Sequence, residues 1–256
     1  MKPLIIAHRG ASYNAPENTL AAVKLAWQMD ADGIEIDVHL TRDGRMVVFH
    51  DDNTRRFGGS RKPISQCDYS ELLKLDVGRF MGDKFAGERI PLLAEVINTV
   101  PENKLLVIEI KSGPETVLPL QSIIHESKIN LKQIEFISFR RDTIIETKKA
   151  FPECKAMRLY EIFQIPLTKI IYPSLNRMID AVKEDKLDGL DISLVPVINQ
   201  SFIKKILDNC LYLYFWTIND LDQARFLIEA GVDAIATDRP DWLREQYNLV
   251  KQNMNL

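Results

Sequence analysis

Cysteine is scarce in this sequence. The 256 residues include three cysteines, Cys67, Cys154 and Cys210, which are odd in number and far apart. This spacing fits neither a disulfide framework nor a zinc site. The absence of both is typical of proteins from a reducing compartment, so we expect the protein to be cytoplasmic.

The amino terminus lacks a long hydrophobic run. Residues 1–8 read Met-Lys-Pro-Leu-Ile-Ile-Ala-His, and charged and polar residues follow at once. The apolar part is too short for a secretion signal and far short of the roughly 20 residues of a membrane span. We therefore expect no stable membrane association.

An excess of positive charge is also missing. Lys and Arg number 33, Asp and Glu number 36, and the net charge is -3. Nucleic-acid-binding proteins need a basic face, so we expect no nucleic-acid partner. Hydrophobic residues make up 46% of the chain, which is enough for a sizeable core.

Short apolar runs alternate with helical patterns along the whole chain. We predict eight strands, at residues 4–8, 33–40, 104–111, 134–138, 155–160, 187–192, 211–217 and 233–237. The predicted helices between them include residues 18–29, with Asn18 and Thr19 at the helix start, and residues 92–100. Strands interleaved with helices indicate a parallel sheet, and eight repeats in about 250 residues match a (β/α)8 TIM barrel, an α/β fold. A doubly wound open sheet is the main rival, but no Gly-rich phosphate-binding turn follows the first strand.

An excursion follows the second predicted strand. Asp43-Gly44 predicts a hairpin turn into a β run at residues 45–50. Residues 51–91 then carry glycines among charges and no strong apolar strand, and so long a stretch inside a compact domain is usually functional. We predict one barrel domain over residues 1–256, with a small insertion at about 51–91.

Ionisable residues share one face of the second strand. Glu35, Asp37 and His39 point one way, and the residues between them are aliphatic. A parallel strand buried on both faces should be apolar throughout, so the ionisable face indicates side chains that enter the barrel. Two unpaired carboxylates would be costly to bury there, and a bound divalent cation would offset that cost.

The third strand adds a third carboxylate. Leu105 and Val107 fill lower layers of the predicted barrel, and Glu109 and Lys111 reach its top. Three carboxylates without a cysteine or a histidine-rich cluster favour Mg²⁺ or Ca²⁺. The alternative is an ion-pair network without metal, in which Arg9 and Lys111 satisfy the glutamates.

Two of the four histidines lie where acid/base chemistry is expected. His8 ends the first strand and His50 ends the hairpin run, so both should lie near the carboxylates and could transfer protons near neutral pH. His39 shares the inward face but lies at the rim, where we expect a supporting or solvent-facing role. His125 lies in a polar helical segment and should be on the surface.

An ordered set of short motifs resembles the glycerophosphodiester phosphodiesterase family. The motifs run from residue 8 to residue 240, which is almost the whole chain. They are His8-Arg9-Gly10, Pro16-Glu17-Asn18-Thr19, Glu35-Ile36-Asp37-Val38, Thr41-Arg42-Asp43-Gly44, His50-Asp51, Glu109-Ile110-Lys111, Trp216-Thr217-Ile218-Asn219 and Thr237-Asp238-Arg239-Pro240. Each motif is weak alone, but the ordered set is highly specific.

The resemblance implies a metal-dependent TIM-barrel enzyme. Its substrate would be a small glycerophosphodiester, hydrolysed to glycerol 3-phosphate and an alcohol. A Mg²⁺ or Ca²⁺ would be held by Glu35, Asp37 and Glu109. His8 and His50 would be the general acid and base, in an order that the sequence leaves open, with water or the glycerol 2-hydroxyl as nucleophile.

The resemblance also implies a substrate pocket. Arg9 and Lys111 would contact the phosphate. Glu17 would orient Arg9 or a substrate hydroxyl, or serve only as an acidic residue in the first turn of a helix. Trp216 would form a wall of the glycerol pocket, or be part of the barrel packing.

The insertion departs from the family pattern. A leucine usually follows His-Asp, whereas residues 52–58 read Asp-Asn-Thr-Arg-Arg-Phe-Gly, and Pro91-Leu92-Leu93 replaces a usual Pro-Thr-Leu. The preferred alcohol is therefore open, as is the oligomeric state.

Two other functions compete with this interpretation. A related barrel phospholipase that acts on lysolipid or sphingolipid would need an exposed apolar rim, and the charged insertion gives little sign of one. A non-catalytic binding barrel would not need both histidines and all three carboxylates, which are present.

Overall fold

Strands and helices alternate from end to end. The computed structural model describes residues 2–59, 61–168 and 170–253. Its strands are β1 (Leu4–His8), β2 (Gly33–Leu40), β3 (Met46–Val48), β4 (Leu105–Ile110), β5 (Ile134–Ser138), β6 (Lys155–Tyr160), β7 (Phe163–Gln164), β8 (Ile171–Tyr172), β9 (Gly189–Ser193), β10 (Tyr212–Trp216) and β11 (Ala234–Thr237). Its α-helices are α1 (Leu20–Gln28), α2 (Tyr69–Leu72), α3 (Leu93–Ile97), α4 (Val117–Glu126), α5 (Arg141–Ala150), α6 (Leu175–Glu184), α7 (Gln200–Leu207), α8 (Leu221–Ala230) and α9 (Pro240–Asn253).

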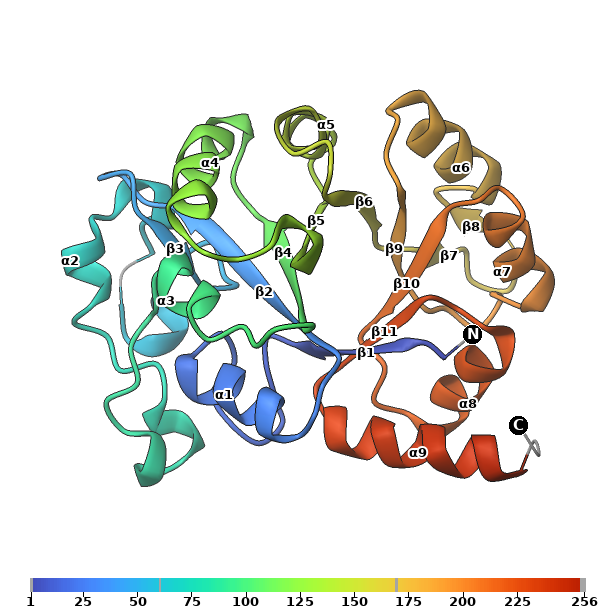
Figure 1. Cartoon of the computed structure of the whole chain (residues 1–256), viewed down its shortest axis with the longest axis horizontal. Helices are drawn as coiled ribbons and strands as arrows, with labels where there is room; N and C mark the ends of the chain where they lie inside the picture. Colours follow the sequence, from blue (N-terminus) through green and yellow to red (C-terminus); the bar gives the residue numbers. More distant parts are fainter. Residues whose placement is uncertain (1, 60, 169, 254–256) are drawn as a thin grey trace.

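Eight parallel strands close into a barrel. They neighbour one another in the order β1-β11-β10-β9-β6-β5-β4-β2, and a parallel pairing between β1 and β2 closes the ring. Helices surround the strands in a ring (Figure 1). The predicted TIM barrel is confirmed, and the open sheet is excluded because β1 pairs with strands on both sides.

Two apolar cores hold the barrel together. The larger one lies between strands and helices, and includes Ile34, Ile36 and Val38. The smaller one includes Val107 and Tyr214, which alternate along their strands with members of the larger core. Since side chains on a strand alternate between faces, the smaller core fills the barrel interior. The interior therefore receives the same face of β2 that carries the carboxylates.

Two segments leave the barrel after its strands. The first begins with β3, which pairs antiparallel with β2, and continues through the insertion (residues 51–91), where short helical turns and α2 enclose a small apolar core. The second is a hairpin of β7 and β8 between β6 and α6, which the sequence did not predict. In Figure 1 the two segments lie on opposite sides of the barrel.

Helix bounds differ slightly from the sequence prediction. The predicted helix at 18–29 begins only at Leu20, because the Thr19 side chain accepts a hydrogen bond from the Ala22 N–H and caps α1. The predicted helix at 92–100 ends at Ile97. Within the described residues, no helix is both long enough and apolar enough to span a membrane.

Candidate active site

Three buried carboxylates meet at the carboxyl ends of neighbouring strands. Glu35 and Asp37 lie on β2 and Glu109 on β4, with Asp37 and Glu109 paired in the strand register. Each of the three residues offers an oxygen, and these oxygens lie within 4.8 Å of one another. The parity of β2 and β4 thus brings these three side chains together, as the sequence predicted.

Burial and mutual repulsion shift the pKa values of the carboxyl groups in this cluster. Burial, with the nearby charges of Asp37 and Glu109, raises the pKa of Glu35 well above its ordinary value. Burial and Asp37 likewise raise the pKa of Glu109 to about 7. Burial acts in the same direction on Asp37, but Lys111 and Arg9 outweigh it and lower its pKa. A bound cation would oppose the two upward shifts, because its charge favours the ionised carboxylates.

Two cations flank the carboxylates. Arg9 Nε lies 3.3 Å from Asp37 Oδ2, and Lys111 Nζ lies 2.9 Å from Glu109 and 3.4 Å from Asp37. Burial alone would lower the pKa of Lys111, but Glu109 and Asp37 raise it, so the ammonium stays charged. These ion pairs are the ones that the network without metal requires. They are not fully hydrogen-bonded, because Asp37 Oδ1 and Arg9 Nε are buried and make no hydrogen bond with the described residues, although Lys111 Nζ lies 3.4 Å from that oxygen.

Arg9 belongs to a strained turn that follows β1. Its φ is 56°, a left-handed conformation that residues other than glycine rarely adopt. Its N–H donates to Glu35 Oε2 at 3.0 Å, which holds the turn against the carboxylate cluster. Gly10 continues the turn with φ 81°, and a Cβ there would lie 2.6 Å from the Ala22 carbonyl carbon. Only glycine allows α1 to pack this closely behind Arg9.

Asn18 contributes to the cluster in a way that the sequence prediction missed. Its Nδ2 donates to Asp37 Oδ2 at 2.8 Å, and its Oδ1 accepts from the Asp37 N–H at 3.2 Å. Asn18 is buried and, like Arg9, has a left-handed backbone, with φ 57°. The prediction assigned Asn18 to the start of the helix, but it precedes the cap and positions a candidate metal ligand.

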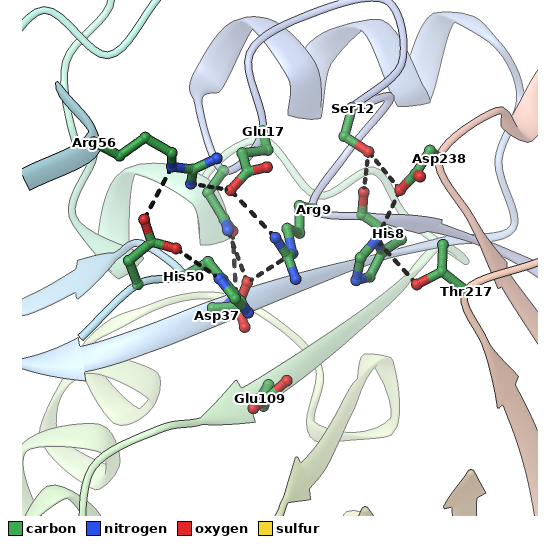
Figure 2. A network of polar contacts seen from close by, with 12 residues as sticks. His8, Arg9, Ser12, Glu17, Asp37, His50, Arg56, Glu109, Thr217 and Asp238 are labelled. Carbon is green, nitrogen blue, oxygen red and sulfur yellow. Dashed lines mark hydrogen bonds and ion pairs between the residues drawn. The ribbon is translucent and has the colours of Figure 1, made fainter. Parts of the chain in front are cut away.

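His8 is held by a carboxylate from the other end of the chain. Its Nδ1 lies 2.8 Å from Asp238 Oδ1 (Figure 2). Burial opposes ionisation of Asp238, but hydrogen bonds from His8, Ser12 and Asn219 prevail and lower its pKa to about 2. Asp238 is therefore a fixed anion at Nδ1, which directs Nε2 of His8 away from it.

His50 shows the same arrangement with a neighbouring residue. Its Nδ1 lies 2.9 Å from Asp51 Oδ1. Burial lowers the pKa of His50, so its imidazole is neutral near pH 7. His39 is buried, and its Nε2 lies 3.3 Å from the His50 carbonyl oxygen, where it supports the backbone that carries His50. The solvent-facing alternative for His39 was wrong, whereas His125 is exposed as expected.

A chain of ion pairs joins the insertion to this site. Arg56 Nη2 donates to Glu17 at 2.6 Å, and its Nε donates to Asp51 at 2.9 Å. Glu17 also accepts from Arg9 Nη1 at 3.2 Å (Figure 2). Glu17 thus contacts the Arg9 guanidinium, as the first of its three expected roles requires. The link to Arg56 was not predicted, because nothing in the sequence relates residue 56 to residue 17.

The two histidines and two of the carboxylates line one cleft of about 270 Å³. Its apolar wall comes from the other half of the barrel, where Phe139 and Trp216 meet edge to face with ring centroids 5.8 Å apart. Leu159 on β6 extends this wall, and Glu161, which follows β6, adds an acidic side chain to the lining of the cleft. Trp216 therefore lines the cleft, and its neighbour in the interior layer is Tyr214.

Asp191 is a further buried carboxyl in this cleft. It lies on β9, is 4% exposed, and its Oδ1 has no hydrogen-bond partner among the described residues. Burial raises its pKa well above the ordinary value, with Glu109 and Glu135 adding to the effect. The sequence offered a signal, since this aspartate interrupts an apolar run at residues 190–192.

Comparisons with known proteins agree with this geometry. Residues 8–242 match the sequence profile described as the glycerophosphoryl diester phosphodiesterase family. A glycerophosphodiester phosphodiesterase from Caldanaerobacter subterraneus is 37% identical over 98% of this chain and 99% of its own length. One from Bacillus subtilis is 26% identical over 93% and 84%.

Solved structures are similar as well. A phosphodiesterase from Oleispira antarctica, in complex with the product sn-glycerol-3-phosphate, aligns with a TM-score of 0.80 at 30% identity and covers 96% of this chain and 97% of its own. A glycerophosphodiester phosphodiesterase from Thermotoga maritima aligns with a TM-score of 0.73 at 26% identity, over 96% and 98%.

Proposed function

Because this chain belongs to the glycerophosphoryl diester phosphodiesterase family, it is a phosphodiester hydrolase, and we propose that two histidines at the barrel mouth perform its proton transfers beside a bound divalent cation. The substrate is a glycerophosphodiester, and the products are glycerol 3-phosphate and an alcohol. One observation carries the proposal: three carboxylates, two of which line the cleft with His8 and His50, converge within 4.8 Å of one another, and each histidine has a carboxylate at Nδ1.

The chemistry of the carboxylates fits a hard cation. Oxygen donors are the ligands that Mg²⁺ and Ca²⁺ prefer, and Glu35, Asp37 and Glu109 supply them. Asp37 Oδ1 is buried without a hydrogen bond from the described residues and has Lys111 Nζ at 3.4 Å, while burial and the neighbouring carboxylates raise the pKa values of both glutamates, so a cation among the three carboxylates would stabilise their ionised forms. When bound, the cation supplies a Lewis acid to a phosphoryl oxygen, worth several kcal/mol.

Arg9 and Lys111 add fixed positive charge. Negative charge grows on the phosphoryl oxygens during attack, and charges already in place lower the barrier without reorganisation. Glu17, itself held by Arg56, orients the Arg9 guanidinium. Lys111 is held between Glu109 and Asp37.

We assign the base to His50 and the acid to His8. The lowered pKa of His50 keeps its Nε2 able to accept the proton of the attacking hydroxyl, from water or from the glycerol 2-hydroxyl. The Asp238 carboxylate would stabilise the positive charge on His8 while it carries the proton for the leaving alkoxide. Each transfer contributes roughly 10²–10⁴-fold in rate.

The direct test is release of glycerol 3-phosphate from several glycerophosphodiesters, with and without a chelator. We expect release only when Mg²⁺ or Ca²⁺ is present. His8→Ala should nearly abolish turnover while the thermal shift on adding the cation persists. Release that resists the chelator would contradict the role of the cation, and near-wild-type turnover by His8→Ala would contradict the role of that histidine.

A further inference from the structure

Exposed apolar side chains are concentrated in one hairpin. In the described part of the chain, thirteen large apolar side chains are exposed, and five of them lie within residues 163–172. They are Phe163, Ile165, Leu167, Ile170 and Tyr172, each with at least 47% of its surface exposed. Strands β7 and β8 form the stem of this apolar hairpin, which we define as residues 162–173.

The apolar hairpin lies at the barrel mouth. It follows β6, whose last residues lead into Glu161, and Glu161 lines the cleft together with His8 and His50. The wall of the cleft on this side includes the apolar side chains of Leu159 and the half-exposed Phe139, together with the carboxyl groups of Glu161 and Asp191. The hairpin therefore begins directly after a residue of the cleft lining.

Several polar backbone groups of the hairpin form hydrogen bonds within it. The Ile165 N–H donates to the Ile170 carbonyl at 2.9 Å, and the Thr168 N–H donates to the Ile165 carbonyl at 3.1 Å. The Thr168 hydroxyl accepts from the Ile170 N–H at 3.1 Å, and the Thr168 carbonyl accepts from Gln164 Nε2 at 2.8 Å. Backbone groups satisfied internally can enter a hydrocarbon layer without the large cost of an unpaired polar group.

The charge of the segment is also suited to lipid. Residues 162–175 contain no Asp or Glu, and Lys169 is their only charged residue. A segment that is apolar, free of carboxylates and carries one cation can meet phosphate headgroups without repulsion. Tyr172, at the stem, has the amphipathic character of side chains at a membrane interface.

We propose that the apolar hairpin docks this enzyme on a phospholipid surface and that its substrates include glycerophosphodiesters that keep one acyl chain. The inference rests on the proposed function, and it goes against the expectation from the sequence that the protein has no stable membrane association. Overall, one water is consumed: the P–O bond to the alcohol breaks, phosphorus gains the hydroxyl oxygen, and the alcohol leaves with a proton. The products are an acylglycerol 3-phosphate and the free alcohol.

The test is flotation of the full-length protein with vesicles of equimolar phosphatidylcholine and phosphatidylglycerol. Wild type should float with the vesicles. The double variant Leu167→Asp, Ile170→Asp should lose about tenfold in bound fraction, because two exposed apolar side chains no longer enter the lipid. Leu249→Asp, which replaces an exposed leucine on α9, is the matched control and should float like wild type.

A second variant guards against misfolding. Leu167→Trp should float at least as well as wild type, and its fluorescence should shift to shorter wavelength when vesicles are added. Failure of wild type to float, or equal flotation of the double variant, would overturn the inference. So would a wild-type dimer that the double variant dissociates, because the hairpin would then contact a second copy of the chain.

Substrate turnover separates this inference from the proposed function. All variants should hydrolyse a soluble glycerophosphodiester at the wild-type rate, whereas the double variant should lose at least fivefold on a monoacyl substrate in vesicles. Loss of flotation with normal turnover of the soluble diester would overturn the docking alone. Flotation without turnover of any diester would overturn the proposed function alone.

Discussion

The two segments that leave the barrel at its mouth are built on opposite physical principles. The insertion encloses its own apolar core, and its Arg56 is joined to the active site by an ion pair with Glu17. Its loops are held by carboxylates such as Asp76. Backbone N–H groups donate hydrogen bonds to Asp76 and lower its pKa to about 2. The apolar hairpin fixes its backbone by its own hydrogen bonds and turns its apolar side chains outward.

This difference suggests a division of labour around one cleft. The charged side, with His50 and the insertion, would act on the phosphodiester. The apolar side, with Phe139 and the hairpin, would meet the part of the substrate that carries hydrocarbon. Changes on the first side should therefore affect the rate with any substrate, and changes on the second side only the encounter with lipid.

Loss of His50 should give the largest effect. We expect His50→Asn to lower kcat for a soluble diester by at least 100-fold, because asparagine cannot accept and return the proton. Steady-state kinetics would measure this, with the exposed His125→Asn as control. A reduction in kcat of less than tenfold would contradict a catalytic role for His50.

The carboxylate cluster should make the metal-free protein sensitive to pH. The pKa of Glu109 is about 7 when folded, above its ordinary value of 4.5, so the folded state binds this proton more tightly than the unfolded state. Stability is then lost as pH rises from about 4.5 through 7, by on the order of 3 kcal/mol, or roughly 6–12 °C in Tm.

Thermal unfolding in chelator at pH 5.5 and pH 8 would measure this loss. Glu109→Gln should flatten the pH dependence, and adding Mg²⁺ or Ca²⁺ should raise the wild-type Tm more at pH 8 than at pH 5.5, because protons compete with the cation. An equal rise in Tm at the two pH values, or no rise at either, would contradict the cation site.

The ion pairs of Arg56 should have a smaller effect. Arg56→Ala removes the partner of Glu17 and Asp51 and frees the groups that orient Arg9 and His50. We expect kcat/KM to fall about tenfold, since half-exposed ion pairs of this kind contribute about 1 kcal/mol. The adjacent, exposed Arg55→Ala is the matched control, and equal kinetics of the two variants would show that the insertion does not act through Arg56.

Changes in the hairpin should matter least for a soluble substrate. Phe163 and Tyr172 face each other in the hairpin register, and both are exposed. Replacing both by serine should leave kcat/KM for a soluble diester within twofold of wild type. A tenfold loss would mean that the hairpin shapes the catalytic cleft, and the division between the two sides would not hold.

Local patterns predicted most of the barrel and the centre of the site. The bounds of all eight barrel strands were predicted to within two residues at each end. Short apolar runs of this length are typical of parallel strands that are buried on both faces. The alternation on β2 and β4 identified the carboxylate cluster, since a strand has only two faces to which a side chain can be assigned.

The long-range pairings and the hairpin could not be predicted from the sequence. His8 meets Asp238 across 230 positions, and no local pattern links the two. The run Phe163-Gln164-Ile165 resembles a buried strand in composition, yet its apolar side chains are exposed. Composition reports how apolar a segment is, not whether a neighbouring element covers it.

The pairing of the first and last strands also has a consequence for biosynthesis. β1 is held by β11, and Asp238, the partner of His8, follows β11 directly. A ribosome that has made nine tenths of the chain has produced both histidines and all three carboxylates, but not the residue that orients His8. Assembly of the His8–Asp238 pair therefore waits for ring closure, and a chain that stops before residue 238 carries an unfinished centre.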